Sequence, residues 1–131
     1  VARYIGTYGT DRVAKAVLAA AVPPYLYKAD DNPDGGLDDA TIAEFEKGVK
    51  SDRPAFFEDF SGNFFSTEQG GLLVSDANRQ YHRDIAWFAS PKGTLDCIGA
   101  FGRTDFRDDL KKIDVPALVI HGDADGVALR R

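Results

Sequence analysis

The residues best placed to do chemistry follow an apolar run near the C-terminus of the chain. Residues 115–120 are Val-Pro-Ala-Leu-Val-Ile, and His121-Gly122-Asp123-Ala124-Asp125 comes directly after them. Such a run is typical of a strand buried in a parallel sheet, and open α/β sheets carry their sites at the carboxyl ends of their strands. Asp125 is therefore a candidate catalytic acid. The alternative is that these aspartates only form an acidic turn.

The two histidines and the single cysteine offer little further chemistry. His82 is expected to be half-exposed on a helix, and His121 to be a packed or hydrogen-bonded core histidine rather than a base. Cys97 is expected to be a small core hydrophobe on an apolar helix face. No Cys/His spacing typical of zinc ligands is present, so the sequence predicts no metal site of that kind.

A weaker pattern suggests calcium. Asp30, Asn32, Asp34 and Gly35 match the first half of an EF-hand loop, but Thr41 stands where the bidentate glutamate is required. No helix is predicted to enter the loop. A polar turn before a helix is the favoured interpretation, and calcium binding is the alternative.

More than half of the phenylalanines fall in one predicted helix, at Phe56, Phe57, Phe60, Phe64 and Phe65. Aromatic residues at helical spacing usually form core. A helical insertion lined with aromatics above the ends of strands also builds apolar substrate pockets. Both interpretations stay open at this point.

The elements that must position these residues follow from periodicity and capping signals. Asp38 is expected to cap one helix, and two more are expected to begin near Ser51-Asp52 and near Ser75-Asp76. A fourth helix carries Leu95, Ile98 and Phe101. The alanines of 12–22 leave a helix as the alternative to a strand there. The predicted order is the end of a helix at 1–8, a buried strand at 12–22, a loop at 23–36, four helices, a short helix at 106–113 and a strand at 115–120.

Composition excludes several classes of function. The 131 residues carry a net charge of −5, with 28% charged and 44% hydrophobic residues, as in a soluble globular domain. The acidic balance argues against nucleic acid, and no apolar run is long enough to span a membrane. The lone cysteine suits a reducing compartment, so a cytoplasmic location is expected. No methionine is present.

Two parallel strands do not make a stable sheet by themselves. The predicted first helix also has no cap before Val1. We therefore expect the chain to correspond to the middle of an α/β domain.

Four stretches carry a family resemblance, and they are Val1-Ala2-Arg3-Tyr4-Ile5, Thr94-Leu95-Asp96-Cys97, Thr104-Asp105-Phe106-Arg107 and 112–125. With them the chain resembles the cofactor-free haloperoxidase, aryl-esterase and perhydrolase group of α/β-hydrolases. In that group a similar Val-Ala-Arg-Tyr follows the serine elbow within a few residues. The resemblance implies an α/β fold class, as a central fragment in which two parallel core strands flank a helical cap.

The resemblance also implies roles for particular residues. Residues 1–22 and 91–131 would belong to the core and 23–90 to the cap. Asp125 matches the triad acid, whose work is to fix the tautomer of a catalytic histidine. The residues that match the lining of the acyl pocket are Phe45, Phe60, Phe101 and Val127.

The implied reaction is ester hydrolysis through a serine acyl-enzyme, with a small-molecule ester as substrate. Hydrogen peroxide can replace water and give a peracid that oxidises halide, so the resemblance implies no metal, haem or other cofactor.

The chain departs from this family in what it lacks. It contains neither the serine elbow nor the downstream catalytic histidine, and Ser66, Ser75 and Ser90 match no nucleophile pattern. Since the serine and the histidine carry out the bond making and breaking, the 131-residue chain alone is expected to be inactive. The alternative function is a helical, aromatic-rich binding or self-associating module without catalysis. Self-association would give a homo-oligomer through the unpaired strand edges.

Overall fold

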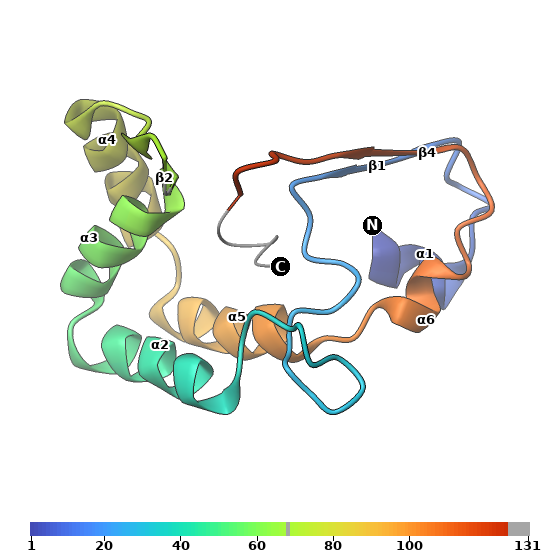
Figure 1. Ribbon diagram of the computed structural model, residues 1–131, viewed down its shortest axis with the longest axis horizontal. Coiled ribbons are helices and arrows are strands. Elements are labelled where there is room, and N and C mark those ends of the chain that lie inside the picture. Colours follow the sequence, from blue (N-terminus) through green and yellow to red (C-terminus); the bar gives the residue numbers. More distant parts are fainter. Residues whose placement is uncertain (68, 126–131) are drawn as a thin grey trace. The chain divides into compact units, whose positions relative to one another are not determined.

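Two short parallel strands pair with each other although most of the helices lie between them in the sequence (Figure 1). In the computed structural model, which describes residues 1–67 and 69–125, β1 (Ala16–Ala19) lies beside β4 (Ala117–Ile120). The register places Ala16 opposite Ala117 and Ala19 opposite Ile120. The strand interpretation of 12–22 is therefore confirmed over the helical alternative, although both strands are shorter than the apolar runs that predict them.

The described residues divide into two compact units. One comprises Val1–Leu37 and the chain from Phe101 onward, and the other comprises Asp38–Ala100. Helix α5 (Pro91–Arg103) contributes to both.

In the unit that contains β1 and β4, α1 (Ala2–Tyr8) packs on α6 (Arg107–Leu110). The first helix ends at Tyr8, and Gly9 follows it with a φ of 76°, in the left-handed region that glycine adopts without a Cβ clash. The buried apolar side chains among the described residues of this unit are Ala2, Ile5, Ala16 and Leu26.

The other unit is built from helices whose N-termini the sequence marks correctly. The side chains of Asp38, Asp52 and Ser75 accept hydrogen bonds from the third residue after each of them. They cap α2 (Asp39–Ser51), α3 (Arg53–Phe64) and α4 (Asp76–Trp87), and α3 packs on both of the others. The buried apolar residues here are Ile42 and Val49.

Several features differ from the sequence-based expectations. The strand expected to be buried at 115–120 forms β4, and all four residues of β4 are exposed, because among the described residues only β1 pairs with it. A two-residue antiparallel pair joins β2 (Ser66–Thr67) to β3 (Gly71–Leu72), where only a connection between helices is expected. Cys97 is exposed on α5 rather than part of a core, because the apolar spacing of that helix does not show which of its faces is covered.

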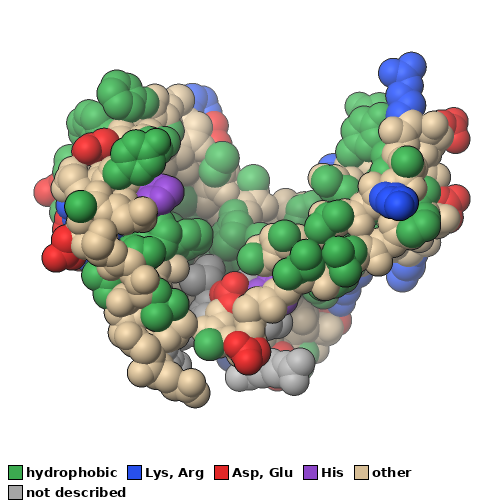
Figure 2. Space-filling model, turned by 90° about the horizontal axis from the view of Figure 1, so that it is seen from above, with side chains coloured by type: hydrophobic (Ala, Val, Ile, Leu, Met, Phe, Trp, Pro, Cys, Tyr) green, Lys and Arg blue, Asp and Glu red, His purple; other side chains and the backbone are tan. Residues whose placement is uncertain are grey.

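Apolar side chains also lie at the surface. Figure 2 shows hydrophobic groups open on the face that it presents. Tyr81 and Ile85 of α4 and Phe88, which follows the helix directly, are exposed, and Phe88 is 88% exposed. Within the described part of the chain, no helix is both long and apolar enough to cross a lipid bilayer.

Candidate functional site

The predicted acid lies just beyond the carboxyl end of β4. A turn brings Asp125 back toward the strand, because its N–H donates to the carbonyl of Gly122 over 3.3 Å. Asp125 Oδ2 then lies 3.7 Å from His121 Nδ1, and the two side chains are only 23% and 17% exposed. His121 is thus partly buried and hydrogen-bonded, in keeping with its predicted place as a structural histidine.

This position suits the chemistry of an orienting acid. A carboxylate that accepts a hydrogen bond from an imidazole Nδ1–H fixes the tautomer of the ring and stabilises the imidazolium. At the carboxyl end of a parallel strand it also lies where open α/β sheets assemble their sites. The assignment of Asp125 as a triad acid stays a prediction, and Val127 lies outside the described residues.

The phenylalanines of α2 and α3 form one continuous cluster. Phe45 packs edge-on against Phe56 and Phe60, with ring centroids 6.0 and 6.4 Å apart. Along α3, Phe56, Phe60 and Phe64 stack in sequence at 5.7 Å steps. The structure therefore brings Phe45 and Phe60 together. Phe101 belongs to the other unit, where it is 38% exposed.

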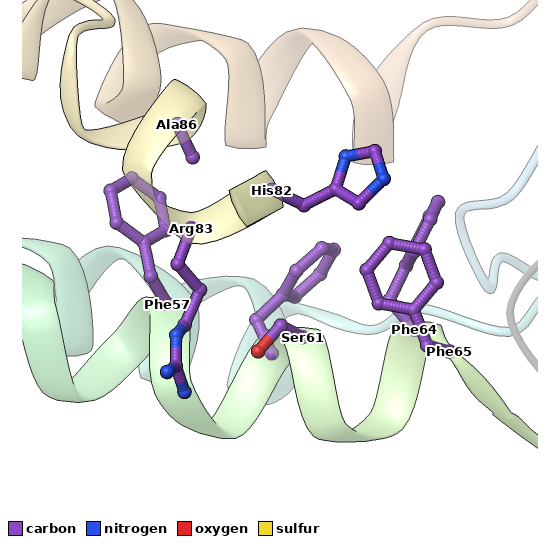
Figure 3. A pocket seen from close by; sticks show the side chains of 8 residues that line it. Phe57, Ser61, Phe64, Phe65, His82, Arg83 and Ala86 are labelled. Carbon is purple, nitrogen blue, oxygen red and sulfur yellow. The ribbon is translucent and has the colours of Figure 1, made fainter. Parts of the chain in front are cut away.

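A cavity of about 180 Å³ opens beside this cluster, between α3 and α4 (Figure 3). Ligand sites in proteins more often measure about 300–1,000 Å³, so this one has room for a small ring or a short acyl chain. Its lining is mostly aromatic, and it consists of Phe57, Phe60, Ser61, Phe64, Phe65, His82, Arg83 and Ala86.

Three polar residues, Ser61, His82 and Arg83, also line the cavity. Glu58 of α3, outside the lining, forms ion pairs with both Arg79 and Arg83 of α4. The His82 ring packs on Phe65 with 5.0 Å between centroids, and Figure 3 shows it reaching toward Phe64 and Phe65. His82 is thus part of an aromatic wall rather than only a surface residue of its helix.

The α4 wall was not predicted, yet the sequence carries a signal for it. Arg79, His82, Arg83 and Ala86 follow the spacing i, i+3, i+4 and i+7 of one helix face. The pattern is easily missed because three of the four residues are polar. Tyr81 and Ile85, large apolar residues of the same helix, are exposed.

The loop that resembles half of a calcium site has other bonds. The Asn32 amide donates to the carbonyls of Tyr25 and Tyr27, and Asp31 pairs with Arg107 at 2.7 Å. Among the described residues, no three His, Cys, Asp or Glu side chains gather as metal ligands. The favoured interpretation, a polar turn before a helix, describes this geometry.

The Arg107 contacts explain one of the motifs that carry the family resemblance. Arg107 donates from its backbone and guanidinium to the Asp105 carboxylate at 2.7–3.0 Å, and it lies 5.0 Å over the Tyr25 ring. These hydrogen bonds hold the pKa of Asp105 below its ordinary value and raise the pKa of Arg107. The cluster closes the loop against α6 and has a structural role.

Parallel strands that enclose a helical segment, with an acid just after the second strand, are features of the α/β-hydrolase fold. The fold is similar to the crystal structure of a bromoperoxidase from Bacillus anthracis, with a TM-score of 0.92 and 58% sequence identity. The match covers 97% of this chain and 46% of that one. No family model matches the sequence.

Curated relatives point the same way. The chain is 42% identical over 127 residues to a non-heme chloroperoxidase of Kitasatospora aureofaciens and 38% identical over 128 residues to a bifunctional esterase/perhydrolase of Acinetobacter calcoaceticus. Each match covers 97% of this chain and 46% of the relative. The chain belongs to the α/β-hydrolases, in the group of the non-haem haloperoxidases and esterases, and it spans about half the length of these relatives.

Proposed function

We propose that the whole protein is a serine hydrolase that cleaves carboxylic esters through an acyl-enzyme. Water releases the acid from that intermediate. Hydrogen peroxide can take the place of water and release a peracid, which then oxidises halide. The observation that carries the proposal is Asp125, placed just beyond β4 in a chain that is similar along 97% of its length to a chloroperoxidase and an esterase/perhydrolase.

In this proposal Asp125 never touches the substrate. Its carboxylate accepts the Nδ1–H of a histidine whose Nε2 takes the proton of the attacking serine. That serine and that histidine belong to parts of the whole protein other than these 131 residues, which contain no serine elbow and no downstream histidine. The scheme needs no metal or haem.

Residues 23–90 would form the cap and the remaining residues a part of the core. Phe45, Phe60, Phe101 and Val127 would line the acyl pocket. The contact between the Phe45 and Phe60 rings supports the aromatic character of that wall. The neighbouring cavity, which Phe60 also lines, supports a small acyl group as the substrate.

The coding sequence around these residues provides the first test. A Gly-x-Ser-x-Gly elbow a few residues before Val1 and a histidine downstream are expected. In the protein expressed with both, Asp125→Asn should lower the rate of ester hydrolysis by about 10⁴-fold, as loss of the acid does in serine proteases. Asp123→Asn is the matched control. Full activity of Asp125→Asn would contradict the assignment.

The 131 residues alone give the complementary test. We expect no stoichiometric burst of phenol from an activated aryl ester, because the groups that attack and transfer the proton are missing. A burst that a serine-directed phosphonate abolishes would show that one of the serines present is a nucleophile after all.

Self-association is the second candidate function, and exposed apolar residues of β4 favour it. Val119 is 68% exposed and Leu118 54% exposed, on a strand that has one unpaired edge among the residues that the structure describes. Such edges pair readily with other chains. We also propose a cytoplasmic location, which the single cysteine of the sequence supports.

A further inference from the structure

The geometry around His121 determines which ring nitrogen carries the hydrogen. His121 Nδ1 lies 3.2 Å from the carbonyl oxygen of Gly122 and 3.7 Å from Asp125 Oδ2. A carbonyl and a carboxylate only accept hydrogen bonds. Nδ1 must therefore be the donor, and a neutral His121 is the Nδ1–H tautomer.

The other ring nitrogen has a different environment. Within the part of the chain that the structure describes, Nε2 of His121 is buried and has no hydrogen-bond partner. The described polar contacts of the ring thus lie on its Nδ1 side, toward the turn of Gly122–Asp125. The Gly122 carbonyl accepts there from the N–H of Asp125 as well as from the ring.

We propose that His121 is a positioning residue for the carboxylate of Asp125. Its Nδ1–H donates to the Gly122 carbonyl and so fixes the turn from which Asp125 projects. The same N–H faces Asp125 Oδ2 and favours one orientation of the carboxylate. Its importance for function rests on the proposed role of Asp125 as triad acid, because an orienting acid works only when its oxygens are held in place.

The chain allows a direct spectroscopic test, since it has only two histidines. In the ¹⁵N-labelled 131-residue protein at about pH 9, long-range proton–nitrogen spectra distinguish the two imidazole tautomers. His82→Gln assigns the signals. His121 is expected as the Nδ1–H form, and this signature should be lost in part in Asp125→Asn. An Nε2–H form at His121 would overturn the proposal.

Side-chain couplings of Asp125 report positioning itself. We expect a single Asp125 rotamer in the wild type and in His121→Asn, whose amide nitrogen replaces Nδ1 as a donor. In His121→Leu the couplings should average over rotamers. A single unchanged rotamer in His121→Leu would overturn the proposal, and if that variant fails to fold, the wild-type tautomer still decides. No catalysis is measured, so these outcomes are independent of the proposed esterase activity.

Discussion

At the scale of single residues, Arg107 shows how one planar side chain can hold a loop. It binds the carboxylates of Asp31 and Asp105 and stacks on Tyr25. A guanidinium suits this place because its fork of donors meets two carboxylates while its face covers an aromatic ring. These contacts give Asp105 and Arg107, two residues of a motif that carries the family resemblance, a structural role in holding the loop.

The Asp105 contact predicts how stability depends on pH. The hydrogen bonds from Arg107 depress the pKa of Asp105, so the carboxylate contributes stability above its unfolded-state pKa, near 4, and this contribution is lost as the pH falls through the folded value. Asp105→Asn should lower the thermal midpoint at neutral pH. The difference from wild type should shrink below about pH 4, as followed by circular dichroism.

Asp96→Asn is the matched control for this prediction. Asp96 pairs with Lys92 on the exposed surface of α5, where such pairs contribute little. Its midpoint should follow the wild type at every pH. A constant difference between Asp105→Asn and wild type down to pH 2 would show that the ionised carboxylate is not what stabilises the loop.

Single-residue signals also explain which parts of the site can be predicted. Asp125 follows an apolar run, and the end of a strand can be read from that run. The pairing of His121 with Asp125 depends on the course of the turn between them, which the residue types alone do not determine. The packing of His82 on Phe65 cannot be predicted from the residue types either, because the β2–β3 pair lies between the two residues in the sequence.

At the scale of elements, the contact between α1 and α6 depends on the absence of one side chain. A Cβ on Gly6 would run into the carboxylate of Asp109. Asp109 is buried there and forms an ion pair with Arg3 at 3.2 Å, while Lys112 donates to the Gly6 carbonyl. The glycine lets the two helices approach closely enough for these bonds to form.

Gly6→Ala should therefore destabilise the chain. The clash should cost about 1–3 kcal/mol, more than the ~0.5–1 kcal/mol that alanine gains over glycine inside a helix. Gly99→Ala is the control, because its Cβ would meet no atom within 4 Å and only the helix gain should remain. Urea unfolding measures both. An equal gain in stability for the two variants would mean that α1 and α6 are not packed as described.

Helix boundaries could be predicted because their causes are local. The side chains of Asp38, Asp52 and Ser75 each accept a hydrogen bond from a backbone N–H only three residues later in the sequence. The ends of β1 depend instead on β4, which lies far away in the sequence and provides four pairing positions. β2 and β3 likewise depend on each other for pairing, and each has only two residues, too few to show an alternating pattern.

At the scale of the whole molecule, the two-stranded sheet of β1 and β4 is open at its edges among the described residues. Among the described residues, β1 and β4 pair only with each other, so each strand has one unpaired edge. All four residues of β4 are exposed. A sheet of two strands is marginal in water, and either further strands from the whole protein or a second copy would stabilise it.

If a second copy does so, the 131-residue chain should exceed its monomer mass of 14.3 kDa in light scattering at high concentration. Val119→Lys should return it to a monomer. A charged side chain on an exposed strand opposes both the pairing of strand edges and the packing of another chain on the face of the sheet. Leu73→Lys is the matched control, since Leu73 is similarly exposed, at 63% against 68%, but lies outside the parallel sheet. A monomer at all concentrations, or equal loss of association in both variants, would rule out assembly through β4. The exposed strand would then be a surface for the rest of the whole protein, as its proposed function requires.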